Sequence, residues 1–181
     1  MTATIVPPAE LFLRETAIRG GMDLMFFAHS RHLRRADDEL ARVGLGRAHH
    51  RVLYFVARKP DMTVGELLTI LAIAKQSLAR VARELTEKGL LTQRPGVRDR
   101  RQRLIALTPA GEALERELFT LLRSNMADAY AASGGTAVTG FWTVMQNLMG
   151  EEARLLFSAL HRNDPLPATG ARSVARAGAD A

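Results

Sequence analysis

The sequence contains no cysteine, no long hydrophobic run and no recognisable catalytic motif. The absence of cysteine excludes a disulfide framework, a thiolate metal site and a cysteine-based redox switch. Charged residues interrupt the longest apolar runs within one or two helical turns, which excludes a transmembrane span. The first eight residues lack the basic start and the apolar centre of a signal peptide. We therefore expect a cytoplasmic protein with no membrane partner.

Signatures of enzymes are missing as well. The sequence has no phosphate-binding loop, no nucleophile elbow and no metal-protease helix, and no acidic pair has a reason for a perturbed pKa. We expect no catalytic residue, no bound metal and no cofactor. An enzyme remains the least favoured alternative.

What the sequence does have is a basic segment, residues 73–103, that carries the whole charge surplus of the chain. The segment holds nine Lys or Arg residues against three Asp or Glu residues, a surplus of six that equals the formal net charge of +6. A surplus confined to one short segment is typical of a surface that meets phosphates, whereas a generally basic protein distributes its charge.

Hydrophobic spacing predicts a mostly helical chain. Apolar residues at steps of three, four and seven indicate one long amphipathic helix from about Glu10 to about Val43, and a helix of this length usually has a partner. Gly20 and Gly21 allow either a break in this helix or a close approach of a second helix. The stripe consists of Leu11, Ile18, Met22, Met25, His29, Leu33, Ala36 and Leu40.

Three shorter helices and two strands follow. A helix over 47–58 faces inward through Val52, Leu53 and Val56, and a capping box of Thr63 and Glu66 opens a helix that carries Leu67, Leu68 and Leu71. A basic helix with Leu78, Val81 and Leu85 on one side runs from about Lys75 to Lys88 and ends at Gly89. Residues 90–93 and 104–107 are expected to form strands of a hairpin with a long basic tip.

The C-terminal third is helical and then loses its periodicity. Thr108 and Pro109 form a helix start, Gly134 and Gly135 interrupt the helix, and a last helix follows. The stretch Asn163–Ala181 is rich in Pro, Gly, Ala and Arg without periodicity, so we expect a disordered tail whose removal leaves dimerisation unchanged.

In this order, the predicted elements resemble the winged helix-turn-helix of the MarR family of bacterial transcriptional regulators. The similarity covers about Leu45 to Leu114, and its most specific part is an Asp-x-Arg wing tip followed by a strand that ends in Leu-Thr and a glycine-containing helix start. The matching blocks are Arg51-Val52-Leu53, Gly65-Glu66-Leu67, residues 85–91, Arg98-Asp99-Arg100-Arg101, residues 105–108 and Gly111. Ala74, where the family usually has a serine-like cap, and Gly46 and His49, where it commonly has Thr and Gln, depart from the pattern.

The resemblance implies a mainly α fold with a small β-hairpin, in which N- and C-terminal helices form a homodimer around the DNA-binding domains. The expected segments are 1–44 (dimerisation helix), 45–108 (winged helix-turn-helix), 109–162 (dimerisation helices) and 163–181 (tail). It also implies an operator in double-stranded DNA and, in many members, a small-molecule effector or an oxidant that relieves binding.

Residues of the basic helix are the candidates for reading DNA. The first two turns of a recognition helix enter the major groove, where Gln suits adenine, Arg suits guanine and Ala can touch a thymine methyl. The candidates are Lys75, Gln76, Ser77, Ala79, Arg80 and, one turn further on, Arg83. A solvated surface helix is the competing interpretation of Lys75 and Arg80.

For the wing, the resemblance places Arg101 in the minor groove, with Asp99 orienting its guanidinium. An arginine suits a narrow minor groove because negative potential concentrates there. The competing interpretation of Asp99 is an ordinary turn residue. Arg94, Arg98, Arg100 and Arg103 are candidates for phosphate contacts or for solubility.

The histidines allow two interpretations. If the first two helices pack, His29, His32, His49 and His50 form a cluster near an effector cleft, and His29 and His49 become candidate effector ligands. The alternative is histidines that serve only packing and the surface, which the lack of tight carboxylate–histidine spacing favours.

The function we expect is that of a dimeric transcriptional regulator, acting as a repressor on a pseudo-palindromic operator. A winged-helix module that binds protein or RNA is the main alternative.

Overall fold

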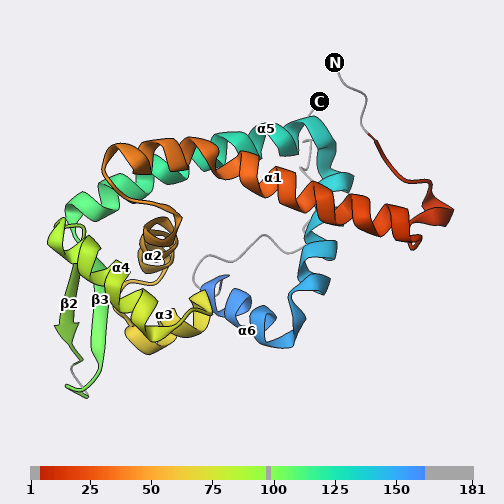
Figure 1. Cartoon of the computed structure of the whole chain (residues 1–181). Helices are drawn as coiled ribbons and strands as arrows, with labels where there is room; N and C mark the ends of the chain where they lie inside the picture. The colour runs from red at the N-terminus through yellow and green to blue at the C-terminus, as the bar shows by residue number, and fades with distance from the viewer. Residues whose placement is uncertain (1–4, 97–98, 162–181) are drawn as a thin grey trace, which may run out of the picture. The chain divides into compact units, whose positions relative to one another are not determined.

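Helices dominate the fold, and one small sheet completes it (Figure 1). The computed structural model describes residues 5–96 and 99–161 of the 181-residue chain. The elements are a 3-10 turn Ala9–Leu11, α1 Glu15–Arg42, α2 Arg47–Arg58, β1 Met62–Thr63, α3 Val64–Leu71, α4 Lys75–Glu87, β2 Leu91–Pro95, β3 Arg103–Leu107, α5 Pro109–Leu148 and α6 Gly150–His161.

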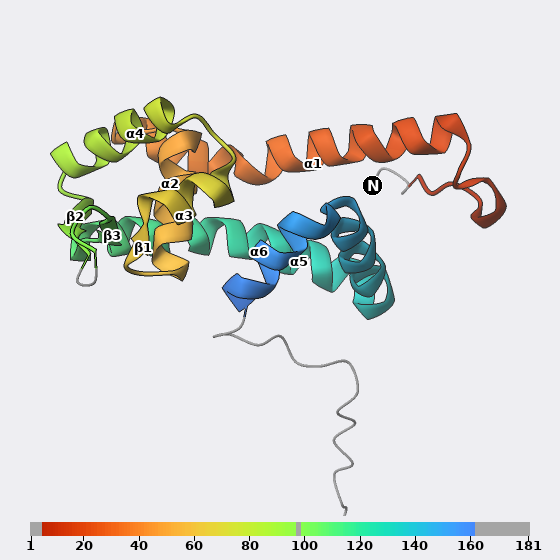
Figure 2. The same ribbon diagram turned by 90° about the horizontal axis from the view of Figure 1, so that it is seen from below.

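Helix α1 is unbroken at Gly20 and Gly21 but starts later than the sequence predicted. It begins at Glu15 and not near Glu10, because Arg14 before it adopts an extended backbone conformation (ψ 147°). Its first half extends away from α2, α3 and α4 (Figure 2). Of the predicted apolar stripe, only Ala36 and Leu40 are buried. The part nearer the N-terminus stays exposed, at 50% for Ile18, 66% for Met22 and 48% for Met25.

The hydrophobic core lies among α2, α3, α4 and the sheet, with contributions from the second half of α1 and the first half of α5. The side chains that the sequence predicted to face inward are buried, except that Leu68 is only partly so. The confirmed core residues of α2, α3 and α4 are Val52, Leu53, Val56, Leu67, Leu71, Leu78, Val81 and Leu85.

The sheet contains one strand more than the sequence predicted. Its order is β1-β3-β2 with both pairs antiparallel. Met62 of β1 pairs with Ile105 of β3, and Leu91 of β2 pairs with Leu107. The predicted hairpin is therefore confirmed, and the short strand β1 ties the start of α3 to it. Thr63 and Glu66 form the predicted capping box at that start.

Hydrogen bonds and close packing connect the end of α4, the start of β2 and the first turn of α5. Gly89 has a φ of +69°, as a helix stop requires, and its carbonyl accepts a hydrogen bond from the Thr108 hydroxyl at 2.6 Å. The Thr108 backbone N–H donates to the carbonyl of Leu90 at 3.1 Å, and Thr108 caps α5 by accepting the N–H of Gly111. A Cβ at position 111 would lie 2.0 Å from the Leu90 oxygen, so only glycine fits there.

Contacts divide the chain into two compact units, Met1–Val138 and Thr139–Ala181. The predicted interruption of the long C-terminal helix is confirmed by Gly134, whose φ of 77° and ψ of 163° kink α5. In the second unit, the Arg154 guanidinium donates to the Gln146 carbonyl at 2.7 Å. The Trp142 and Phe157 rings meet edge to face with centroids 6.2 Å apart. The domain boundaries expected from the sequence remain predictions.

Candidate nucleic-acid interface

Helix α4 has one buried side and one exposed side. Leu78, Val81, Ala82 and Leu85 lie at steps of one, three and four and are all at most 5% exposed, so this side is fixed against the core. The helix follows α3 after a turn in which Ala72 has a left-handed φ of 49°. This is the helix-turn-helix geometry that the sequence predicted. The opposite side of α4 faces solvent and carries the candidate residues Lys75, Gln76, Ser77, Ala79, Arg80 and Arg83, all exposed.

The N-terminus of α4 has no side-chain cap, as the alanine at position 74 indicated. Ala74 is the N-cap residue, with an extended backbone (ψ 141°). The first amides of an uncapped helix point away from the helix and carry a partial positive charge. Together with Lys75, these amides make the start of α4 suitable for a phosphate.

Two acidic residues pair with the exposed arginines of α4. Arg80 donates to Glu84 Oε1 at 3.0 Å, and Arg83 lies 3.9 Å from Glu87. The second oxygen of Glu84 contacts His49 Nε2 at 2.6 Å, and this hydrogen bond is the main reason that the pKa of Glu84 lies below its usual value. Sequence reasoning did not identify Glu84 as a site residue, although its spacing of four from Arg80 is a visible signal for an ion pair.

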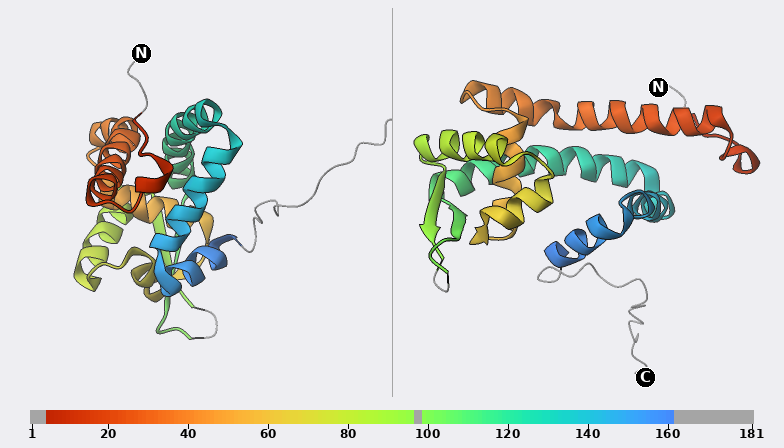
Figure 3. Two further views of the ribbon diagram at one scale, coloured as in Figure 1. Left: turned by 90° about the vertical axis from the view of Figure 1, so that its right-hand side faces the viewer. Right: turned by 60° about the horizontal axis from the view of Figure 1, so that its bottom comes forward.

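The wing is the β2–β3 hairpin, which projects from the helices (Figure 3). At its tip, the N–H of Gly96 donates to the Gln102 carbonyl. The backbone is so tightly packed there that a Cβ at position 96 would lie 2.7 Å from the Asp99 carbonyl oxygen. Asp99 Oδ1 accepts the backbone N–H of Arg101 at 2.9 Å. In the structure, Asp99 therefore reaches the backbone of Arg101, as a carboxylate two residues earlier in a turn commonly does. Its predicted orientation of the Arg101 guanidinium on DNA stays a prediction.

The arginines of the wing differ in their partners. Arg94 pairs with Asp61, with Nη2 and Oδ2 2.8 Å apart. Arg100, Arg101 and Arg103 are exposed and form no ion pair with the part of the chain that the structure describes. Arg98 lies outside the described residues. The wing thus presents unpaired cations next to one that is already neutralised.

The histidines separate into two groups. His49 is hydrogen-bonded to Glu84 of α4. Burial lowers the pKa of His50, and the nearby His32 lowers it further to a lesser extent. Burial, and then His29, lower the pKa of His32. His50 Nε2 is buried without a hydrogen-bond partner among the described residues, while His29 is exposed. Electrostatic effects thus link His29 to His32 and His32 to His50, whereas His49 is bonded to Glu84, and a shared effector site stays a prediction.

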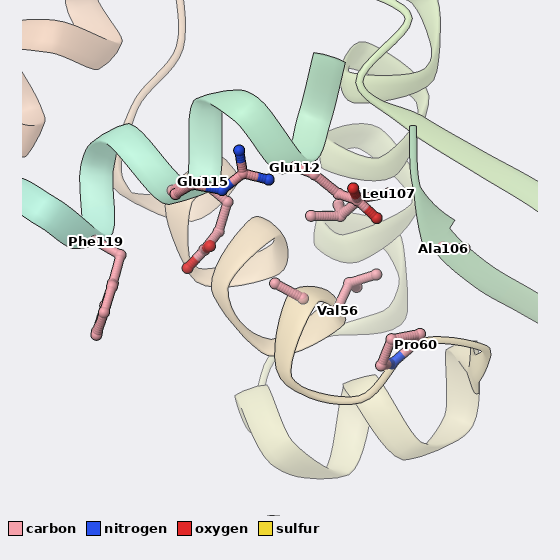
Figure 4. A pocket seen from close by; sticks show the side chains of 9 residues that line it. Val56, Pro60, Ala106, Leu107, Glu112, Glu115 and Phe119 are labelled. Atoms are coloured by element: carbon pink, nitrogen blue, oxygen red, sulfur yellow. The ribbon is translucent and has the colours of Figure 1, made fainter. Parts of the chain in front are cut away.

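A shallow hollow of about 230 Å³ lies between the end of α2, β3 and the start of α5 (Figure 4). Val56 and Leu107 give it an apolar floor, and Glu112 and Glu115 stand at its edge. Burial raises the pKa of Glu115. No residue of α4 lines the hollow. Within residues 5–96 and 99–161, no cluster of three histidines or carboxylates is arranged to hold a metal ion, and no helix is both long and apolar enough to cross a membrane.

Comparisons with known proteins agree with this geometry. A family model described as the MarR family matches residues 43–102. The HTH-type transcriptional regulator PetP of Rhodobacter capsulatus is 41% identical over 162 residues, which cover 88% of this chain and 98% of PetP. Among solved structures, a variant of MarR from E. coli in complex with operator DNA has a TM-score of 0.59 at 20% identity and covers 76% of this chain and 98% of its own. CouR from Rhodococcus jostii, bound to p-coumaroyl-CoA, has a TM-score of 0.60 at 19% identity and covers 70% of this chain and 90% of its own.

The identity to PetP extends over almost the whole of both proteins, and the MarR model falls on the helix-turn-helix and the wing. With the exposed basic face of α4 and the projecting hairpin, these matches show that the chain belongs to the MarR family of DNA-binding transcriptional regulators.

Proposed function

We propose that the protein is a homodimeric repressor that reads a pseudo-palindromic operator with α4 in the major groove and the wing in the minor groove. The observation that carries this proposal is the two-sided character of α4. Its apolar side is locked into the core, while Lys75, Gln76 and Arg80 share the exposed side with its uncapped N-terminus. A helix held in this way presents a fixed pattern of donors to base edges.

Base reading falls to the first two turns of α4. Gln76 has the amide geometry to pair with adenine, Arg80 can donate two hydrogen bonds to guanine, and Ala79 can touch a thymine methyl. The exposed face, the uncapped N-terminus and Lys75 beside it support this role over that of a helix that serves only the surface.

The wing supplies contacts that sense groove shape. Arg101 is exposed and free of an ion pair within the described part of the chain, so its guanidinium is available for a narrow minor groove. Asp99 acts on the turn through the Arg101 amide. Arg98, Arg100 and Arg103 are assigned to phosphates.

Dimerisation follows from the apolar surface that the single chain leaves open. Phe26 and Phe27 of α1 are 69% and 68% exposed, and Leu155 of α6 is 67% exposed. Large apolar side chains exposed on each of the two units are candidates for an interface. Two copies related by a two-fold axis would read half-sites about 10 base pairs apart. Sedimentation at micromolar concentration is expected to give twice the 19.9-kDa mass, and a monomer alone would contradict the proposal.

The decisive experiment measures affinities of variants for a panel of single-base operator changes, after the operator has been selected from random DNA. Arg80→Ala is expected to remove discrimination at one base position, worth about 1–3 kcal/mol. Arg101→Ala is expected to weaken all operators together, most strongly those with A·T-rich flanks. If Arg80→Ala lowers every affinity equally, Arg80 is a phosphate contact and base reading falls to Lys75, Gln76 and Ser77.

Arg94→Ala is the matched control for Arg101→Ala. Both residues lie in the hairpin, but Arg94 is already paired with Asp61. We expect its loss to change affinity less than the loss of Arg101. Equal losses would show that the wing acts only through its total charge.

Salt dependence tests the number of phosphate contacts. Each neutralised phosphate contributes a slope of about −0.9 to log K against log salt, so about 3–5 contacts per subunit give a steep fall between low and physiological salt. A flat dependence would rule out the phosphate-binding role of the basic segment.

Repression and its relief are tested by transcription in vitro. A dimer that covers an operator within a promoter is expected to reduce transcript in proportion to occupancy. Because CouR binds p-coumaroyl-CoA, a small-molecule effector is part of the proposal. We place it near His29 and His50, whose Nε2 has no hydrogen-bond partner in the described part of the chain. His49 is the weaker of the two predicted effector ligands, since both of its ring nitrogens already have partners. Compounds that restore transcription should change the NMR chemical shifts of the His50 ring. A compound that restores transcription without changing them would contradict that placement.

A further inference from the structure

A buried histidine on α2 is connected to the recognition helix. His49, 8% exposed, contacts Glu84 Oε2 through its Nε2 at 2.6 Å, across 35 residues of sequence. This contact links the first turn of α2 to the third turn of α4. Glu84 is the residue whose other oxygen accepts from Arg80.

The hydrogen-bond partners of His49 assign the proton of its neutral ring. The backbone N–H of Gly46 donates to Nδ1 at 3.1 Å, so Nδ1 is an acceptor and Nε2 carries the hydrogen. Nε2–H therefore donates to Glu84. The same ring caps α2 and fixes the carboxylate, because both of its nitrogens are engaged.

The carboxylate in turn fixes the direction of Arg80. One N–H of Nη1 donates to Glu84 Oε1 at 3.0 Å. A guanidinium has five N–H groups, so the edge formed by Nε and Nη2 stays available for the two acceptors of a guanine. Because His49 holds Glu84 and Glu84 holds Arg80, the Arg80 side chain loses less conformational entropy when it binds a base.

We propose that His49 is a positioning residue for base recognition: by holding the Glu84 carboxylate, it sets the orientation in which Arg80 meets its base. The inference rests on the proposed base-reading role of Arg80. It adds a specificity-determining residue that lies outside the recognition helix and touches no DNA.

The neighbouring pair on α4 shows what the histidine adds. Arg83 and Glu87 have the same spacing of four, but their closest atoms are 3.9 Å apart and both side chains are 68% exposed. The Glu84 side chain, with His49 behind it, is 32% exposed and makes hydrogen bonds at 2.6 and 3.0 Å. Two pairs on one helix therefore differ in whether the carboxylate is anchored.

The test compares full-length variants on the same panel of single-base operators. Glu84→Gln and His49→Ala are expected to reduce discrimination at the base read by Arg80 about 2- to 10-fold, the lower part of the range found for coupled residues. Discrimination at the other positions should stay unchanged. Glu87→Gln is the matched control and should leave the Arg80 position unaffected.

A conservative variant separates positioning from folding. His49→Gln keeps an acceptor for the Gly46 amide and a donor for Glu84, so it should retain most of the discrimination that His49→Ala loses. Thermal unfolding monitors the cap. If His49→Ala lowers the melting temperature but leaves the base profile unchanged, His49 only caps α2 and the inference is overturned.

A double-mutant cycle gives the sharpest readout. In the Arg80→Ala background, His49→Ala should cause no further loss of discrimination at that base. Losses that multiply would show that His49 acts independently of Arg80 and would overturn the inference while leaving base reading by Arg80 intact. An Arg80→Ala variant with equal losses on every operator would instead contradict the base-reading role itself and remove the inference with it.

Discussion

Apolar side chains are buried in the winged part of the chain but exposed in the first half of α1. Leu53 and Leu85 are fully buried, whereas Met22, Phe26 and Phe27 are between 66% and 69% exposed. The core around α2, α3, α4 and the sheet is therefore completed by one chain. The first half of α1 has apolar side chains like those of a core, but the part of the single chain that the structure describes provides no surface for them to pack against. In the proposed dimer, a second copy provides that surface.

The largest effect is expected from the buried side. Leu53→Ala should lower the free energy of unfolding by about 2–5 kcal/mol, because it leaves a cavity that the packed helices cannot fill. Leu13, 75% exposed, provides the control. Leu13→Ala should change the free energy of unfolding by less than about 0.5 kcal/mol. Denaturant titration measures both, and equal losses would show that burial does not decide the cost of removing a leucine side chain.

Two Gly→Ala changes sharpen the comparison. Gly111→Ala should destabilise the winged part by about 1–3 kcal/mol, because the new methyl group would meet the Leu90 carbonyl. A methyl group added at Gly20 in α1 would meet nothing within 4 Å. Gly20→Ala should stabilise the helix by about 0.5–1 kcal/mol. A weaker dimer in Gly20→Ala would show instead that Gly20 lets two helices approach closely.

A charge on the exposed half of α1 tests its partner. Met22→Asp should raise the dimer dissociation constant at least about 10-fold, since desolvating an unpaired carboxylate is unfavourable. The winged fold should be unaffected, because Met22 contributes nothing to its core. Sedimentation measures dissociation and circular dichroism the fold; loss of both together would mean that the two regions fold as one.

The smallest effect concerns pH at the boundary of the two regions. Burial holds the pKa of His50 below its ordinary value of 6.5. The unfolded chain therefore binds more protons than the folded one just below pH 6.5, and stability falls as the pH falls from 6.5 toward the lower folded value. His32 contributes in the same direction, whereas Asp37 opposes it at His50. His50→Leu should show a shallower loss of stability over this range, and an unchanged pH profile would exclude His50 as its cause.

Local signals predicted most of the fold. The apolar spacing of α2 and α4, the Thr63–Glu66 capping box and the glycines at 89 and 134 each act within a few residues and were predicted correctly. Strand β1 was missed because two residues have no periodicity and pair with residues more than about 40 positions away.

In the candidate site, too, local features were predicted and long-range contacts were not. The exposed face of α4 was predicted from helical periodicity, whereas the His49–Glu84 contact joins residues 35 apart. Only the packing of α2 on α4 brings them together. The contact of Asp99 with the Arg101 backbone was not predicted, because a pattern of residue types does not distinguish a guanidinium from a backbone amide.

The junction at Gly111 gives α5 the geometry of a lever. Its first turn is bonded to the end of α4 and to the start of the wing strand through Thr108, and its arm runs to the kink at Gly134. At 1.5 Å per residue the arm is about 37 Å long, so one degree of rotation about the junction displaces its far end by about 0.6 Å. Conversely, a shift of a few ångströms at the far end changes the angle of the wing by only a few degrees. In the proposed dimer, a change in the angle of the wing therefore requires a displacement of the α5 arm larger than a side-chain adjustment.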